Sequence, residues 1–391
     1  MIIDGSDPTP KYHQLRKHLA DQIASQRIRV GDQLPSEDEL ARKYSLSRNT
    51  VRQALEHLDK EGYIERSHGR GTFVIADQPR RSSSAWMVIV PDIRYPVFPE
   101  LIRSIEDVAR EHGISLILGN SDYRPEQQLA YIERALHERL AGVALSPLLT
   151  GDQNAPRLNA LKSAGIPLVF LVRGIPGVEA PQVVCRNRLG GYLATKHLTA
   201  LGHRRIGYLS WPRYTVNLDR FAGHLEALQE AGIPEREEYV RFAPDPDPTD
   251  MEWPEKSDRF VVKTALEMLE MKDPPTALFV PRDLTAFLVY QAIEDTGRRI
   301  PDDVSLVGFD ALPSPEFVRG RLTSIAYPKQ ETGAEAARLL LALSEGENVP
   351  SRVELAPTLV EGNSTRAVTE SPSRRVPKSG GRSLRGLKIS T

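Results

Sequence analysis

From Trp86 onward, short unbroken apolar runs alternate with segments of helical periodicity, and this alternation constrains the fold more than any other feature of the sequence. The first set of runs is WMVIV, ISLILG and GVALS, and the second is RIGYLS, TALFV and VSLVGF. An apolar run without polar alternation is typical of a strand buried on both faces, and intervening helices connect parallel strands. Two such sets predict two doubly wound α/β lobes with a cleft between them.

The N-terminal part has a different pattern, which predicts a small, mainly α unit. Apolar residues at helical spacing over residues 12–23 indicate a first amphipathic helix. Ser36 and Glu39 have the spacing of a capping box for a second helix, and Ser47 stands where a third helix begins. Gly62 would end that helix, and the apolar pairs YI and FV flank the turn SHGRG as in a two-stranded wing.

Composition and the positions of the polar segments rich in proline, serine or glycine suggest the domain organisation of the 391 residues. We expect a helical unit over residues 1–76, a Pro- and Ser-bearing linker over 77–85 and the two-lobed part over 86–366. The basic, Ser- and Gly-rich tail, 367–391, is typical of a disordered segment. The polar stretch DPDPTDMEWPEKSD, 245–258, is interpreted as a surface loop.

The cysteine count and the apolar runs limit the class of protein. Cys185 is the single cysteine, so neither an intramolecular disulfide nor a cysteine metal cluster is expected. The N-terminus has no pattern of a signal peptide, and no apolar run is long enough for a membrane span. We therefore expect a cytoplasmic protein without a metal, a cofactor or a membrane partner. The net charge of −1 still allows a local basic surface that binds phosphate.

The predicted third helix places polar and basic residues on its leading turn. Ser47 can cap the helix and donate to a phosphate, while Arg48, Asn49 and Thr50 follow it and Arg52 lies one turn after Arg48. A helix in the major groove uses its N-terminal residues in this way, with arginine pairing to guanine and asparagine to adenine. A solvated helix face is the alternative for either arginine alone. On the wing turn, the candidate DNA contacts are His68, Gly69 and Arg70.

The segment LPSEDELARKYSLSRNTVRQALEHLDKEGYIERSHGRGTFV resembles the winged helix-turn-helix of the GntR family. The resemblance implies DNA contacts by Arg48, Asn49, Thr50 and Arg52 and by Gly69 at the wing tip. Members of that family often have a basic DNA-contacting residue where this chain has Asp38. Phosphate would repel a carboxylate, so that contact is not transferred to this chain.

The region after Trp86 resembles the sensor of the LacI/GalR family through three pieces, NRLGGYLATKHLTALGHRRIGYLS, LDRFAGHLEAL and TALFVPRDLTAFLVYQAIEDTGRRIPDDVSLVGFD. A GntR-type unit joined to such a sensor is the arrangement of the arabinose-repressor subgroup. The resemblance implies a small molecule, commonly a sugar, bound between the lobes. The matched ligand positions are Tyr95, Phe98, Arg220, Arg282, Asp283 and Asp310.

The chain departs from that family where acceptors are usual. Arg186 and Arg282 stand at positions that are commonly acidic or amide, and Val172 and Arg173 end a strand at which an acidic residue is common. One hypothesis is an anionic ligand, a sugar phosphate or a sugar acid, held by Arg173, Arg220 and Arg282. The competing interpretation is that these arginines only pair with acids across the cleft.

These features together favour a sequence-specific DNA-binding transcription regulator over an enzyme. The sequence lacks a P-loop and a metal-ligand histidine pair at helical spacing. The expected partners are an operator duplex, a sugar-like effector and a second copy of the chain in a homodimer. Repression relieved by the effector is the favoured mode. A ligand-responsive activator and a cytosolic sugar-binding protein without regulatory DNA binding are the alternatives.

Overall fold

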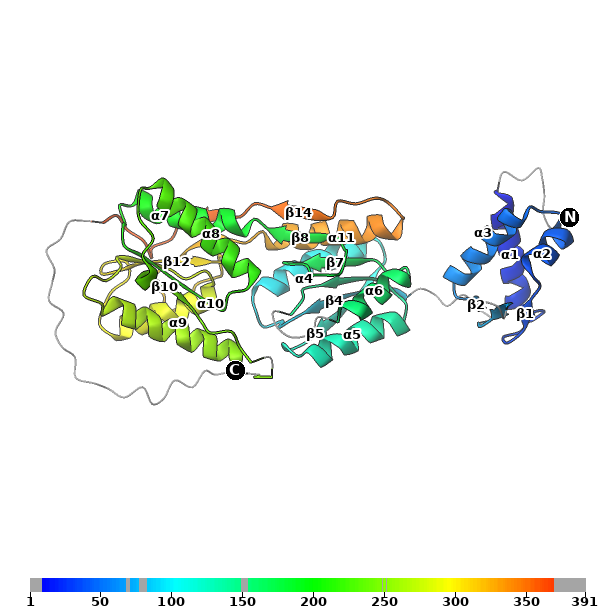
Figure 1. Ribbon diagram of the computed structural model, residues 1–391, viewed down its shortest axis with the longest axis horizontal. Coiled ribbons are helices and arrows are strands. Elements are labelled where there is room, and N and C mark those ends of the chain that lie inside the picture. Colours follow the sequence, from blue (N-terminus) through cyan, green and yellow to red (C-terminus); the bar gives the residue numbers. More distant parts are fainter. Residues whose placement is uncertain are drawn as a thin grey trace.

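The computed structural model describes residues 9–67, 71–76, 83–148, 154–247, 249–250 and 252–368. Figure 1 shows a small N-terminal unit and two α/β lobes. The predicted fold class, a mainly α winged helix-turn-helix followed by two lobes with parallel sheets, is confirmed. The expectations for the tail from residue 369 onward and for linker residues 77–82 lie outside the described residues.

In its described residues, the N-terminal unit has three helices and three short strands. They are α1 (Lys11–Ala24), β1 (Gln33–Leu34), α2 (Glu37–Tyr44), α3 (Arg48–Lys60), β2 (Ile64–Ser67) and β3 (Gly71–Val74). The sheet order is β1-β3-β2 with antiparallel pairing, so the wing has one more strand than the sequence suggested. The added strand comes from the short turn before α2, where Leu34 is buried in the core of the unit.

Both predicted helix starts in this unit are confirmed. Ser36 and Glu39 form a reciprocal capping box at α2, and the Ser47 side chain accepts a hydrogen bond from the Thr50 backbone N–H at α3. Such caps satisfy backbone donors that the first turn of a helix leaves free. They fix the angle at which α3 leaves the turn, and therefore which of its residues face outward.

The first lobe is an all-parallel sheet of order β14-β8-β7-β6-β4-β5 with helices on both faces. Trp86, Val88 and Val90 pack with α4 and α11, whereas Met87 and Ile89 pack with α5 and α6 on the opposite face. The elements of this lobe are β4 (Ser83–Val90), α4 (Val97–Glu111), β5 (Ser115–Asn120), α5 (Pro125–His137), β6 (Leu140–Leu145), α6 (Ala155–Ser163), β7 (Leu168–Leu171), β8 (Gln182–Cys185), α11 (Lys329–Ser344) and β14 (Arg352–Leu355).

The second lobe has the sheet order β10-β9-β11-β12-β13-β15, and all pairs except β13–β15 are parallel. Its elements are α7 (Asn187–Ala200), β9 (Ile206–Ser210), α8 (Thr215–Glu230), the 3₁₀ turn η1 (Glu237–Tyr239), β10 (Val240–Phe242), α9 (Trp253–Leu269), β11 (Ala277–Phe279), α10 (Asp283–Asp295), β12 (Ser305–Phe309), β13 (Thr323–Ala326) and β15 (Thr358–Val360).

Over the residues that the structure describes, the chain passes between the lobes at three places. These are the connections from β8 to α7, from β13 to α11 and from β14 to β15. Figure 1 shows α7 and α8 over one lobe and α11 and β14 over the other. Short connections of this kind let two rigid lobes rotate about a few residues, so they are the natural hinge of the molecule.

The expectation of a surface loop over 245–258 is wrong in its second half. Residues from Trp253 onward belong to α9, and the Trp253 side chain is buried against Trp211, Tyr214 and Tyr123. The sequence neighbours of Trp253 are polar, so the sequence does not predict that its side chain is buried in the core. Its edge-to-face contact with Tyr123 joins the second lobe to the first.

Candidate functional site

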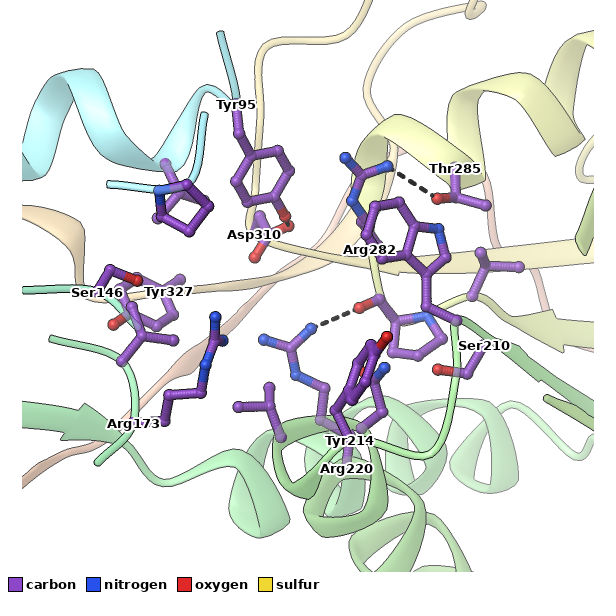
Figure 2. A pocket seen from close by; sticks show the side chains of 18 of the residues that line it. Tyr95, Ser146, Arg173, Ser210, Tyr214, Arg220, Arg282, Thr285, Asp310 and Tyr327 are labelled. Atoms are coloured by element: carbon purple, nitrogen blue, oxygen red, sulfur yellow. Dashed lines mark hydrogen bonds between the residues drawn. The ribbon is translucent and has the colours of Figure 1, made fainter. Parts of the chain in front are cut away.

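A cavity of about 120 Å³ lies between the two lobes. Its wall includes residues that follow β4, β7, β9, β11 and β12, so it lies at the carboxyl ends of parallel strands in both sheets. Open α/β sheets bind ligands at this edge, because the strand-to-helix loops converge there. Six of the predicted ligand residues line the cavity, namely Tyr95, Phe98, Arg173, Arg220, Arg282 and Asp310. Figure 2 shows most of the polar ones pointing into one space.

Arg220 is fixed in place by close helix packing. Carbonyl oxygens of α8 and α7 face the two glycines at the helix crossing, where a Cβ on Gly191 or on Gly223 would lie 1.9 Å from an opposing backbone oxygen. The Arg220 guanidinium donates from Nε to Asn187 Oδ1 at 2.9 Å and from Nη1 to the Pro281 carbonyl at 2.5 Å. It also lies 3.6 Å from the centre of a phenyl ring of β12. The guanidinium is therefore preorganised at the cavity wall.

Arg282 has a carboxylate partner within its own lobe. Its Nη1 lies 3.3 Å from Asp258 of α9, and it also donates to Thr285 Oγ1 at 3.2 Å. Its guanidinium lies between two aromatic rings, 4.7 Å from the centre of Tyr95 and 4.0 Å from that of Trp211. For this arginine, pairing with an acid agrees with the geometry, although the acid belongs to the same lobe and is not across the cleft.

Asp310 is the acidic group of the wall. The Tyr95 hydroxyl of the first lobe donates to its carboxylate, so this hydrogen bond spans the cleft. Burial raises the pKa of Asp310, and the neighbouring charge of Arg220 opposes that effect. A carboxylate in this position can accept hydrogen bonds from ligand hydroxyls.

The structure does not bring Asp283 into the cavity wall. Its side chain is fully buried and accepts hydrogen bonds from the Leu312 backbone N–H at 2.7 Å and from Ser324 Oγ at 2.8 Å. Burial and the nearby charge of Asp310 raise the pKa of Asp283 well above its usual range. Its contacts are those of a group that holds the loop after β12.

Arg173 reaches the cavity from the loop after β7. Its Nη2 donates to the Pro147 carbonyl, and its Nε is shielded from solvent without a hydrogen-bond partner among the described residues. The side chain as a whole is half-buried because part of it lines the cavity. Desolvation lowers the pKa of Arg173 to about 10, which leaves it charged at neutral pH.

Further polar residues of the wall were not predicted from the sequence. Ser146 and Ser210 stand at or just after the ends of β6 and β9, and the group also includes Tyr123, Tyr214, Asn217, Thr285 and Tyr327. Ser146 and Ser210 could have been predicted from their position in the sequence, because each lies at the polar end of an apolar run that predicts a strand. The tyrosines belong to loops whose path the sequence pattern does not reveal.

The leading turn of α3 presents its arginines to solvent. Arg48 pairs with Asp38 at 3.0 Å, with 68% and 57% of the two side chains exposed. Arg52 donates to Asn49 Oδ1 at 2.7 Å and lies 3.8 Å from Glu56. The Ser47 hydroxyl is within 2.7 Å of the Thr50 hydroxyl. The predicted wing contacts His68, Gly69 and Arg70 lie outside the described residues.

The described residues offer neither a membrane-spanning helix nor a metal-binding cluster. No helix there has both the length and the apolarity that crossing a bilayer requires. In those same ranges, no three His, Cys, Asp or Glu side chains gather in a way that could hold a metal ion.

Two family models match the chain. One described as bacterial regulatory proteins, gntR family, matches residues 11–74. One described as periplasmic binding protein-like domain matches residues 195–365. The first match covers the helices and wing of the N-terminal unit, and the second covers most of the second lobe together with α11 and β14.

Curated relatives match along most of the chain. The arabinose metabolism transcriptional repressor of Geobacillus stearothermophilus is 31% identical over 368 residues, which cover 92% of this chain and 98% of that protein. The HTH-type transcriptional repressor CytR of Escherichia coli strain K12 is 30% identical over 325 residues, covering 82% and 88% of the two chains. Among solved structures, a LacI family transcriptional regulator from Enterococcus faecium with bound ribose is similar with a TM-score of 0.60 and 27% identity, covering 73% of this chain and all of that one.

Proposed function

Because the chain belongs to the arabinose-repressor group of transcriptional regulators, which join a gntR-type DNA-binding unit to a LacI-type sensor, we propose that it represses transcription from an operator and that a small polyhydroxylated effector in the cavity releases it. The curated relatives that this chain matches over most of their length are transcriptional repressors. The chain is a DNA-binding regulator, and the proposal concerns its effector, its mode of action and its residues.

One observation carries the proposal for the cavity. Five of the eight shielded polar side-chain atoms that have no hydrogen-bond partner in the described residues belong to the wall of this one cavity. They are Ser146 Oγ, Arg173 Nε, Ser210 Oγ, Tyr214 Oη and Tyr327 Oη. Tyr208 and Thr332 lie near the Ser210 and Tyr327 hydroxyls without completing a hydrogen bond of ordinary geometry. Since unpaired buried polar groups are costly, a ligand rich in hydroxyls is the natural partner for them.

The aromatic groups of the wall support a sugar-type ligand. Tyr95, Phe98, Trp211 and Tyr214 line the same space as the unpaired polar atoms. A wall that is largely apolar with a few fixed polar groups is typical of small-molecule sites. The ribose bound in the similar Enterococcus faecium regulator supports the same class of ligand.

The leading turn of α3 is proposed as the element that reads the operator. Ser47 and Thr50 would contact phosphate, and Arg48, Asn49 and Arg52 would reach base edges in the major groove. The solvent-exposed pairs that these side chains now form contribute little stability, so DNA can displace their present partners. The wing residues His68, Gly69 and Arg70 are proposed as further backbone contacts.

A homodimer is proposed for operator binding. One N-terminal unit, called the reader below, neutralises few phosphates and binds DNA weakly. Two readers held together by paired sensors would bind more tightly, because binding of the first raises the effective concentration of the second at the operator. An operator with two-fold symmetry would match such a dimer. Rotation of the lobes about the three connections between them would then change the separation of the two readers.

The test begins with selection of duplexes from a random pool by the full-length protein. The selected duplex is footprinted with and without a panel of sugars, sugar acids and sugar phosphates. We expect a footprint with two half-sites that weakens with at least one compound. A footprint independent of sequence, or one insensitive to every compound that binds the cavity, would contradict the proposal.

A further inference from the structure

The arginines of the cavity differ in how their charge is compensated. The guanidinium of Arg282 has Asp258 as a carboxylate partner at 3.3 Å. Arg220 is held by an amide oxygen and a carbonyl, and its charge acts on Asp310. Within the described residues, Arg282 therefore forms an ion pair with Asp258, whereas Arg220 has no carboxylate oxygen within 4.0 Å and is compensated only by the nearby charge of Asp310.

Arg173 has neither kind of compensation. No carboxylate oxygen of the described residues lies within 4.0 Å of its guanidinium, and the ionisable groups that act on it are tyrosines. Its protein acceptor there is the Pro147 carbonyl. Its Nε–H is shielded from solvent and has no acceptor within those same residues. Figure 2 shows the Arg173 side chain extending into the space that Ser146 and Tyr327 also face. A shielded cation without a counter-charge is costly, so this part of the cavity favours an anion.

We propose that the effector is a sugar acid, whose single carboxylate accepts a hydrogen bond from Arg173 Nε and is neutralised by this guanidinium. The hydroxyls of Ser146 and Tyr327, which lack partners, surround the carboxylate, and Asp310 accepts from the ligand hydroxyls at the opposite end. This inference rests on the proposed function and narrows the class of its effector.

The charge balance favours a carboxylate over a phosphate. A phosphate monoester has a charge of about −1.5 to −2 at neutral pH. Arg173 offers one uncompensated positive charge, because Arg282 and Arg220 already face carboxylates. A phosphate would leave net negative charge in a space that also contains Asp310, whereas a carboxylate is balanced. Arg173 Nη2 is already engaged with a carbonyl, which also suits a small anion.

The size of the cavity agrees with a monosaccharide. A single water needs only about 10–15 Å³, so a cavity of about 120 Å³ has room for a ligand of several heavy atoms, as a monosaccharide acid is.

The experiment uses tryptophan fluorescence of the full chain. All three tryptophans lie in the two lobes, and Trp211 is part of the cavity wall. The probes are matched sets of neutral pentoses and hexoses, their aldonic and uronic acids and their phosphate esters, each titrated to 10 mM. The variant Arg173→Gln removes the charge but keeps a donor, and Arg186→Gln is the matched control, because Arg186 is exposed and outside the cavity wall. The variant Asp152→Asn tests the one acidic residue of segment 149–153, which the structure does not describe.

We expect at least one acid to bind ten or more times more tightly than its neutral parent and its phosphate ester. Arg173→Gln should abolish this preference, while Arg186→Gln and Asp152→Asn retain it. The inference is overturned if no acid binds by 10 mM, if a neutral sugar or a phosphate binds best, if Arg173→Gln keeps the preference or if Asp152→Asn removes it. A neutral sugar that binds best and weakens the footprint would leave the proposed function intact.

Discussion

Arginines occupy two contrasting environments in this molecule. On α3, Arg48 and Arg52 are 68% and 57% exposed, and each pairs loosely with an acid on the surface. In the cavity, Arg220 is 7% exposed and is fixed by an amide, a carbonyl and an aromatic ring. A surface pair is worth about 0–1 kcal/mol and exchanges readily. A buried guanidinium is held in one orientation by its surroundings.

Exposed and buried arginines suit two different kinds of recognition. A reader that moves along DNA benefits from arginines whose partners can be exchanged for phosphates or bases. A site for a small molecule benefits from groups that need no reordering when the ligand arrives. Solvent exposure, more than residue type, therefore separates the two roles.

Acid should affect the sensor lobes strongly. Burial lowers the pKa of His224 to about 3. Because the folded-state value is depressed, the neutral imidazole stabilises the lobe above pH 6.5, and this contribution is lost as pH falls from 6.5 towards 3. The full loss is on the order of 5 kcal/mol. Burial also lowers the pKa of His203 and His197, with the same sign. Urea melts followed by tryptophan fluorescence at several pH values measure this, because the tryptophans report only the lobes.

The variant His224→Gln provides the control for acid sensitivity. It should flatten the dependence on pH between 6.5 and 4, even though it costs stability at neutral pH. A pH dependence that is unchanged in the variant would show that this histidine is not buried in its neutral form.

Loss of one reading arginine should have the next largest effect. Arg52→Ala is expected to weaken binding to the selected duplex about 100-fold, since a good bidentate base contact is worth about 1–3 kcal/mol and a dimer loses two. The tryptophan-monitored melting of the lobes should stay unchanged. Binding within threefold of the unmodified protein, measured by fluorescence anisotropy, would count against α3 as the reader.

Removal of the uncompensated cavity charge should stabilise the empty protein. Arg173→Met is expected to raise the free energy of unfolding of the ligand-free chain by about 1–2 kcal/mol, because a shielded unpaired charge is replaced by a side chain of similar length. Urea unfolding without ligand measures it. The exposed control Arg186→Met should change stability by less than about 0.5 kcal/mol. A destabilised Arg173→Met protein would mean that the charge is already compensated.

The smallest effect is expected at the surface pair of the reader. Asp38→Asn frees Arg48 and removes a negative charge next to the proposed phosphate path. Affinity for the selected duplex should rise about three- to fivefold at 0.1 M salt, consistent with an exposed pair worth less than about 1 kcal/mol. Glu106→Gln on α4, which removes a surface acid outside the reader, is the matched control. Equal or weaker binding by Asp38→Asn would place Arg48 away from DNA.

Patterns of the sequence predicted most of the fold. The unbroken apolar runs identify strands buried on both faces, because helices cover both sides of each sheet. Capping chemistry located the starts of α2 and α3, since Ser36 and Ser47 act within a few residues of the helix. The wing strand β1 was missed because it is only two residues long and is defined by its partner. Trp253 was missed because a single apolar residue in a polar stretch has no periodicity.

The cavity was predicted only in part. The family resemblance indicated Arg220 and Asp310, whose positions follow from motif order. It also indicated Asp283, which lies one residue from Arg282 in sequence but points into the lobe interior. The charge balance was not predictable, because the pairing of Arg282 with Asp258 depends on the packing of α9 against α10. Sequence order does not show which of several arginines lacks a counter-charge.

The most direct test measures operator affinity with the cavity empty and with it saturated. A labelled duplex selected by the protein is titrated with the full chain, while tryptophan fluorescence reports how much of the cavity is filled by the tightest-binding sugar acid. We predict that saturation weakens duplex binding at least tenfold in the unmodified chain. The same concentration of acid should leave duplex binding by Arg173→Gln unchanged, because the acid no longer fills that cavity. Equal affinity with a demonstrably filled cavity would contradict the coupling of the two sites.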